Sequence, residues 1–175
     1  VICALGGKLS DLLVAVGGFG TTAARKRLEG VATEIATHLQ QARSEAVSRN
    51  RFVRLTFGTD CLFVHTLTTA GTSTASCSGT TPPVPGAGEE VIARVGRSAS
   101  DVSVTREPTA TPVTHYQFDH LTGGMNVAVP AGHGIVVGST AGPWLLRVRV
   151  NAAGRVELCT PATGPGTTMP GYATC

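Results

Sequence analysis

The chain has 175 residues, a length that suits a single domain with a sizeable hydrophobic core. Only 14% of its residues are charged, and Gly and Thr are abundant, a composition that favours strands and turns over a helical bundle. The formal net charge of +3 permits an acidic partner but does not require one.

Residues 1–24 form an apolar, Gly-rich leading segment. This segment lacks the ~18 uninterrupted apolar residues of a membrane span, because Lys8 and Asp11 interrupt it. The basic run Arg25-Lys26-Arg27 follows, and it fits either a membrane–water boundary or a solvated helix face. We therefore divide the chain into this lead and a globular domain over residues 25–175.

An amphipathic helix is predicted over about 22–49, because apolar side chains recur at spacings of three and four residues. We expect Asn50 to end this helix. A lone helix with this pattern could not stay folded, so its apolar face must cover a sheet. That face consists of Val31, Ile35, Leu39, Ala42 and Ala46, with Ala32, Ala36 and Val47 beside it.

Beyond Asn50 the apolar pattern changes to period two, which is typical of strands separated by turns. The sequence therefore predicts an α+β fold, in which one long N-terminal helix packs on antiparallel β-sheet. Strands are expected at 52–57, 62–67, 91–95, 102–106, 114–118, 127–129, 135–137, 144–150 and 155–158, with a turn at Gly123-Gly124.

The five cysteines predict two local disulfides, Cys61–Cys77 and Cys159–Cys175, with Cys3 left over. Each bridge would close a loop of about 15 residues, worth roughly 3 kcal/mol in the chain-entropy model. Such bridges imply an oxidising compartment. The alternative is that all five are buried thiols, since connectivity is not readable from a sequence.

Strand alternation makes the last predicted hairpin interpretable, because Arg147 and Arg149 must point to the same face of the sheet. A three-residue loop at 151–153 sets Arg149 opposite Arg155 and Arg147 opposite Glu157. This register keeps the apolar side chains inside, whereas a slip by one residue would bury the arginines. Gly154 is suited to the positive-φ position of such a loop.

Arg149 facing Arg155 would destabilise a sheet, and an anionic partner would relieve the repulsion. DNA phosphate is a natural partner, because clusters of arginine bind it without base contacts. We therefore predict a DNA-binding face made of Arg147, Arg149 and Arg155, with Arg51 and Arg54 as a secondary basic surface. The alternative is a solvated strand face that protects the sheet from aggregation.

Three segments of the chain resemble the GspH/FimT type of minor pilins and pseudopilins, which are subunits of type IV pili and of the type II secretion pseudopilus. They are Ala42-Arg-Ser-Glu-Ala-Val-Ser-Arg-Asn50, Tyr116-Gln-Phe118 followed by Gly123-Gly124, and Gly154-Arg-Val-Glu-Leu-Cys159. The resemblance implies a pilin-like domain over residues 25–175. It also implies that other pilin subunits are the partners, and that the leading segment sits in the inner membrane before assembly.

The resemblance also assigns roles near the N-terminus. It places a processing site after Gly6 and puts Asp11 at the family's acidic position, where the acid pairs with a neighbouring subunit's N-terminal amine. Gly7 replaces the usual bulky residue and Lys8 is unsuited to lipid, so residues 1–24 correspond to a degenerate or altered anchor. The alternative is an ordinary exposed Asp11.

Our first hypothesis is a minor type IV pilin that moves from the inner membrane and periplasm to a cell-surface pilus. It would bind double-stranded DNA for uptake, as FimT-like pilins do through arginines around the Gly-Arg motif. Glu157 stands where that pattern has a second basic residue. The second hypothesis is a type II secretion pseudopilin with a purely structural role, and the third is a secreted β-rich binding module unrelated to pili.

No catalytic motif supports an enzyme, because the sequence lacks G-x-S-x-G, H-E-x-x-H and a phosphate-binding P-loop. His115 and His120 flank Asp119, but one short strand cannot easily gather three metal ligands. We therefore expect no enzymatic activity, no metal site and no cofactor.

Overall fold

The computed structural model describes residues 9–58, 61–78, 82–95, 102–107, 114–126, 133–162 and 169–175, with their side chains from Gly20 onward. Within these ranges the chain forms one helix and eight strands. The helix α1 spans Leu9–Arg49. The strands are β1 Val53–Phe57, β2 Leu62–Thr66, β3 Val91–Val95, β4 Val102–Glu107, β5 His115–Phe118, β6 Gly134–Ser139, β7 Leu145–Val150 and β8 Val156–Cys159.

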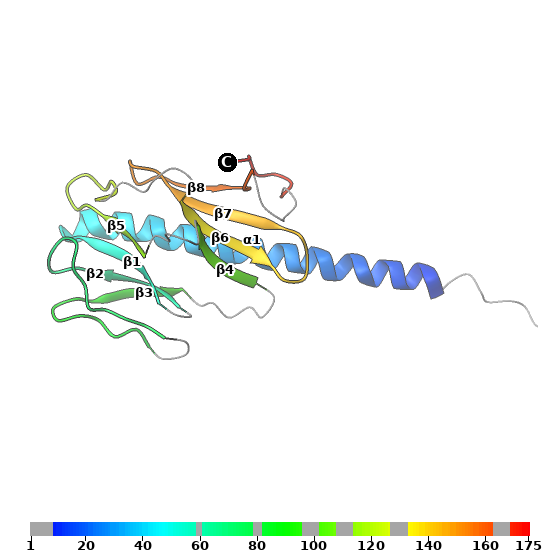
Figure 1. The fold of residues 1–175 in the computed structure, drawn as a ribbon, viewed down its shortest axis with the longest axis horizontal. Helices are drawn as coiled ribbons and strands as arrows, with labels where there is room; N and C mark the ends of the chain where they lie inside the picture. The colour runs from blue at the N-terminus through cyan, green and yellow to red at the C-terminus, as the bar shows by residue number, and fades with distance from the viewer. Residues whose placement is uncertain are drawn as a thin grey trace, which may run out of the picture.

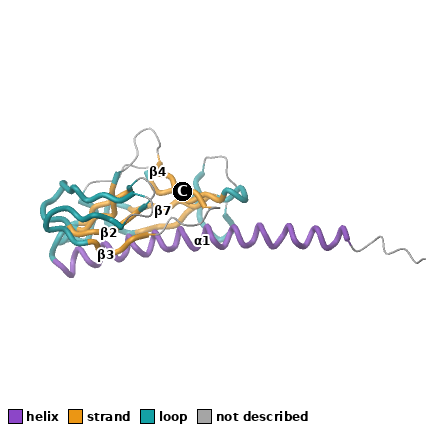
Figure 2. The backbone as a smooth tube through the Cα atoms, turned by 90° about the horizontal axis from the view of Figure 1, so that it is seen from below, coloured by secondary structure: helices purple, strands orange, loops and turns teal. Residues whose placement is uncertain are grey.

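The strands form two antiparallel sheets, which we call sheet 1, with the order β3-β2-β1-β5, and sheet 2, with the order β4-β6-β7-β8. The helix α1 packs against strands of both sheets and joins them (Figure 1). Seen from below, the N-terminal part of α1 extends well past the strands (Figure 2). The structure therefore confirms the predicted α+β class, with a long N-terminal helix on antiparallel sheets.

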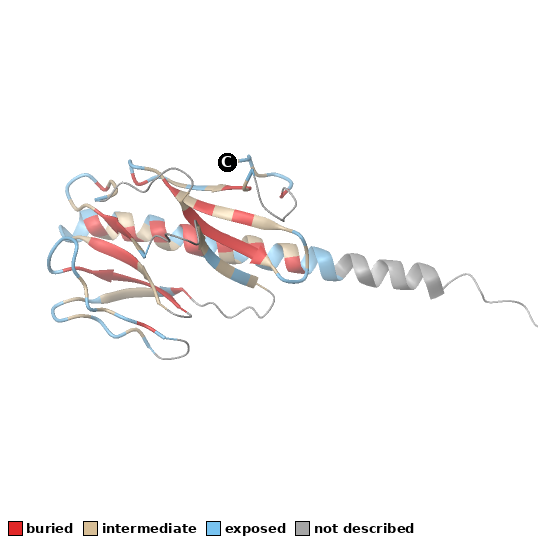
Figure 3. Cartoon of the chain, in the orientation of Figure 1, coloured by how far each residue is buried: buried red, intermediate tan, exposed pale blue. Residues whose placement is uncertain are grey.

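One stripe of α1 supplies the helix side of the hydrophobic core, which also takes in apolar side chains from both sheets (Figure 3). The prediction is wrong at Val47, which is 52% exposed, and Val31 is only partly buried. Both lie about 100° around the helix from a buried neighbour, so they fall on the edge of the stripe. The stripe consists of Leu28, Ala32, Ile35, Leu39, Ala42 and Ala46, all 0% exposed.

The C-terminus of α1 has the hydrogen bonds of a Schellman motif. Arg51 N donates to Ala46 O at 3.2 Å and Asn50 N donates to Val47 O at 3.4 Å, while Asn50 adopts a φ of 50°. Asn tolerates this left-handed conformation better than most residues. The prediction that Asn50 ends the helix is therefore confirmed.

The predicted strands agree with the observed ones to within two residues, except for 127–129, which lies outside the described residues. The start of the helix was predicted less well, because α1 begins at Leu9 instead of near residue 22. Gly17, Gly18 and Gly20 all lie inside it. A glycine costs about 1 kcal/mol in a helix, which weakens a helix without ending it.

Both predicted disulfides are present, Cys61–Cys77 with a Cα–Cα distance of 6.2 Å and Cys159–Cys175 with one of 5.6 Å. The second bridge fixes the C-terminal end of the chain beside β8, where Thr160 N donates to Ala173 O at 2.8 Å. Met169 is buried in the core, and Arg25 Nη2 donates to Pro170 O at 2.9 Å. The C-terminal residues therefore pack against α1.

Candidate functional site

The three segments that carry the family resemblance meet at the side chain of Arg43. Its Nε donates a hydrogen bond to the carbonyl oxygen of Gly123 at 2.9 Å. Gly154 closes the contact, because a Cβ atom built there would lie 2.4 Å from that oxygen and 3.4 Å from Arg43 Cδ. Both glycines have a positive φ, of 63° and 74°, which residues with a side chain rarely adopt. We call this meeting point the Arg43 junction.

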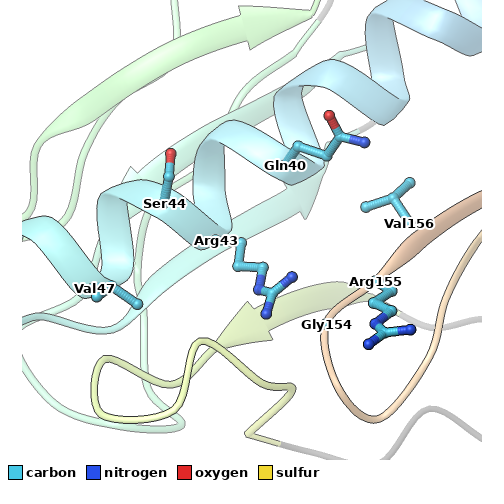
Figure 4. Close-up of a pocket in the computed structure, with 7 residues that line it drawn as sticks. All are labelled: Gln40, Arg43, Ser44, Val47, Gly154, Arg155 and Val156. Carbon is cyan, nitrogen blue, oxygen red and sulfur yellow. The ribbon is translucent and has the colours of Figure 1, made fainter.

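A groove of about 540 Å³ opens beside the Arg43 junction, between α1 and the loop that leads into β8 (Figure 4). The side chain of Arg43 extends from the helix and that of Arg155 from the loop into the same opening (Figure 4). We call this opening the arginine groove. The described residues that line it are Gln40, Arg43, Ser44, Val47, Gly154, Arg155 and Val156, and none of them carries a carboxylate. Two guanidinium groups without a counter-ion suit the binding of an anion.

Arg155 lies in the loop that joins β7 to β8 and is exposed. Asn151 closes this loop, because its N–H donates to Arg155 O at 3.0 Å and its Oδ1 accepts the Arg155 N–H at 3.0 Å. Gly154 has the positive φ that was predicted for it. The Arg155 side chain forms no ion pair with any described carboxylate, so its charge is available to a partner.

The pairing of the last hairpin differs from the predicted register by two residues. Arg149 lies opposite Glu157 and Val150 opposite Val156, so the predicted pair of Arg149 with Arg155 is wrong. A shift by two keeps every side chain on its predicted face, and strand alternation therefore cannot detect it. Arg149 Nη2 lies 2.6 Å from Glu157 Oε2, so no repulsion in this pair calls for an anionic partner.

Arg147 is also placed differently from the prediction, because it lies opposite Cys159 and not opposite Glu157. Its guanidinium group forms an ion pair with Glu107 of β4, with Nε 3.1 Å from Oε2. Its Nη1 also donates to Cys175 O at 3.4 Å. Of the three predicted DNA-binding arginines, the structure brings only Arg155 to the arginine groove.

The predicted secondary basic surface is wrong at Arg54, which is only 6% exposed. Arg54 lies on the face of sheet 1 away from α1, and its Nη2 donates to Gln117 Oε1 at 2.6 Å. Burial lowers the pKa of the Arg54 guanidinium, and the charge of Glu89 opposes this shift. Arg51 is exposed, and its Nη2 donates to Gly88 O at 3.3 Å. The two arginines do not form one surface.

A buried polar cluster beside Arg54 was not predicted. His65 is 0% exposed and its Nδ1 lies 3.2 Å from Glu89 Oε2, while its Nε2 lies 2.9 Å from Thr56 Oγ1. Glu89 Oε2 also accepts hydrogen bonds from Ser73 Oγ and Gly86 N, at 2.9 and 3.1 Å. Burial lowers the pKa of His65, while Glu89 raises it. These contacts hold the segment before β3 against the face of sheet 1 that lies away from α1.

The predicted processing and assembly residues are not placed by the structure. Gly6 lies outside the described residues, and Asp11 is described only as part of the α1 backbone. Across the part of the chain that is described, no helix is long and apolar enough to cross a membrane. The same residues hold no group of three His, Cys, Asp or Glu side chains that could bind a metal ion.

Arg43 is the site residue that sequence reasoning missed. It belongs to the first segment of the family resemblance, but its partner Gly123 is 80 residues away in sequence. No local pattern links these two positions, and the helical periodicity places Arg43 outside the buried stripe. The one sequence signal that could have suggested contact between the three segments is that all three carry the family resemblance.

Residues 31–154, more than half of the chain, match the family described as type II transport protein GspH. No curated protein matches the chain significantly.

Among solved structures, the chain is similar to a crystal structure of the type IV minor pilin FimU from Pseudomonas aeruginosa (strain PAO1). The identity is 18% and the TM-score 0.52, over 83% of this chain and 95% of that one. A second crystal form of FimU has 17% identity and a TM-score of 0.48, over 81% of this chain and 97% of that one. The first likeness shows a shared fold, and the family match shows that the chain belongs to the GspH family.

Proposed function

We propose that this chain is a minor subunit of a type IV pilus, which enters the filament through α1 and has no enzymatic role. The observation that carries the proposal is the extension of α1 past both sheets (Figure 2). Ala24 is the first buried side chain among those described. Because a helix without cover is marginal in water, we infer that other pilin subunits pack against the part of α1 before it.

In this proposal Gly6 and Asp11 serve processing and assembly, as the family resemblance implies. The leading segment is held in the inner membrane before cleavage after Gly6, and Asp11 then pairs with a neighbouring subunit's N-terminal amine in the filament. Mass spectrometry of the native protein should find a mature chain that begins at Gly7. A mature chain that retains Gly6 would remove both assignments.

We further propose that the subunit binds DNA for uptake, without sequence preference, through Arg155 in the arginine groove. The support is that none of the described residues lining this groove carries a carboxylate. Arg147 and Arg149 should contribute less, because a phosphate would have to compete with Glu107 and Glu157 for them.

DNA binding is tested by fluorescence anisotropy with a short labelled duplex at two salt concentrations. We expect the affinity to fall steeply with salt, and Arg155→Gln to weaken binding roughly tenfold. Arg149→Gln is the matched control, because it removes the same charge from the same hairpin but from an ion pair, and it should cost clearly less. Wild-type protein that fails to bind, or an equal loss in both variants, would contradict the assignment of Arg155.

The alternative function is that of a type II secretion pseudopilin, which the family description favours. Its partners would be other pseudopilins, and it would not need DNA. Deletion of the gene distinguishes the two, since loss of DNA uptake supports the pilin and loss of protein secretion supports the pseudopilin.

A further inference from the structure

Arg43 enters the arginine groove as a side chain that is already fixed in position. Its Nε is held by the Gly123 carbonyl oxygen, while its two terminal nitrogens form no hydrogen bond or ion pair with any described residue. An arginine held in this way loses less conformational freedom when it binds a ligand than a free one does. The two terminal nitrogens are therefore pre-organised donors.

The loop before β8 brings Arg155 to the same place. Gly154 approaches the Gly123 carbonyl oxygen more closely than any residue with a Cβ atom could, and this contact sets the position of the next residue. The backbone of Arg155 is held by both hydrogen bonds to Asn151. The Arg43 side chain and the Arg155 backbone are thus held at one place by the Arg43 junction, although 112 positions (155 − 43) separate the two residues in sequence.

The two acidic residues nearest in sequence to the described groove residues are already paired with other arginines. Glu45 forms an ion pair with Arg49, and Glu157 forms one with Arg149. Two cations that share an opening repel each other, and an anion bound between them would remove this repulsion. Among the described lining residues, Gln40 offers its amide as a neutral donor, and none has an aromatic side chain.

We propose that Arg43 and Arg155 together hold a single backbone phosphate of bound DNA and that the groove reads no base. This inference rests on the proposed DNA binding and identifies Arg43 as a second residue that contacts the DNA. Two guanidinium forks can each donate to the oxygens of one phosphate, and Gln40 adds a third donor. Because none of the described lining residues is aromatic, they offer no surface on which a base could stack.

A double-mutant cycle tests whether the two arginines share one phosphate. Arg43→Gln, Arg155→Gln and the double variant are compared by anisotropy over a range of salt concentrations. We expect each single variant to bind about 5- to 20-fold more weakly. Neutralising one phosphate accounts for a salt slope of about 0.9, and the arginine left in a single variant still contacts that phosphate. The slope should therefore fall by no more than about 0.9 in either single variant and in the double variant. A fall of about 1.8 in the double variant would show two separate phosphates and overturn the shared site.

Arg43 also has a structural contact, so a second variant leaves that residue untouched. Gln40→Glu places a carboxylate beside both arginines at an exposed position and should weaken DNA binding by roughly tenfold or more, with a urea midpoint that is not lowered. Gln41→Glu is the matched control, because its side chain instead meets His38, at 3.2 Å. Equal losses in these two variants would contradict the proposed phosphate position.

The outcomes separate this inference from the proposed function. If wild-type protein binds no DNA, the DNA-binding function itself fails. If wild-type protein binds and Arg155→Gln weakens binding, while Arg43→Gln and Gln40→Glu bind normally, the function stands and the shared phosphate site is wrong. Duplexes rich in A·T and in G·C should bind equally, and a clear preference would contradict a groove that contacts only the backbone.

Discussion

At the scale of single residues, His65 shows burial and charge acting in opposite directions on one imidazole. Burial is the largest effect and lowers the pKa of His65, with a smaller contribution in the same direction from Arg54. Glu89 and the carbonyl of Thr66 raise it, but the net shift is downward. The unfolded chain, in which the pKa of histidine is about 6.5, therefore binds this proton more readily than the folded protein.

Because folding lowers the pKa of His65, the stability of the protein should depend on pH. The contribution of His65 should be fully present above about pH 6.5 and lost as the pH falls through the lower pKa of the folded state. Burial also lowers the pKa of His115, so His115 acts in the same direction. Urea unfolding of wild type and His65→Gln on both sides of pH 6.5 measures the effect. We expect a weaker decline in the variant, and an identical decline would show that His65 is not responsible.

Gly154 permits a second residue-scale prediction. Gly154→Ala should lower the free energy of unfolding by roughly 2–4 kcal/mol, because the new Cβ atom would overlap the Gly123 carbonyl oxygen at a backbone position of φ 74°. Gly71→Ala is the matched control, since Gly71 has a φ of 84° but no atom within 4 Å of a Cβ. The control should cost only about 1–2 kcal/mol of backbone strain. Equal costs in urea unfolding would mean that the close contact is unimportant.

At the scale of elements, the α1 positions that contribute most to stability are those in the buried apolar stripe. Leu39→Ala should cost about 3–5 kcal/mol, because Leu39 is fully buried between the helix and the sheets. Val47→Ala, near the end of the same helix, should cost less than about 1 kcal/mol, since Val47 is half exposed. Chemical denaturation of both variants measures the difference. Similar losses would contradict the burial of the stripe.

Element types were predictable because their signals are local. Helical spacing identified the buried face around Leu39, and the 16-residue separation within each cysteine pair indicated both disulfides. The register of β7 and β8 was not predictable in this way. Alternation fixes which face Arg149 occupies, but not whether Arg155 or Glu157 lies opposite, because both face the same side. The loop length settles this choice, and 151–155 is longer than predicted.

At the scale of the whole molecule, the errors concern contacts between residues that are distant in sequence. Arg54, on the side of sheet 1 away from α1, was expected to belong to a secondary basic surface. It is buried there instead. The segment before β3 covers part of this side, held by the Cys61–Cys77 disulfide and by the contact of His65 with Glu89. The same distinction applies to the candidate site. Arg155 was predictable because it lies in a hairpin recognisable from the local sequence. Arg43 was not, because its position depends on a contact with Gly123, 80 residues away in sequence.

The Arg43 junction has a consequence for how the protein matures. A partner of Arg43 lies 80 positions away, and Gly154 lies further still, so the junction has a high contact order and should close late in folding. A nascent chain whose last hairpin has not yet emerged from the ribosome contains the α1 sequence but cannot form the groove. The proposed phosphate site is therefore absent from truncated or unfinished copies, and the proposed DNA binding requires a subunit whose synthesis is complete.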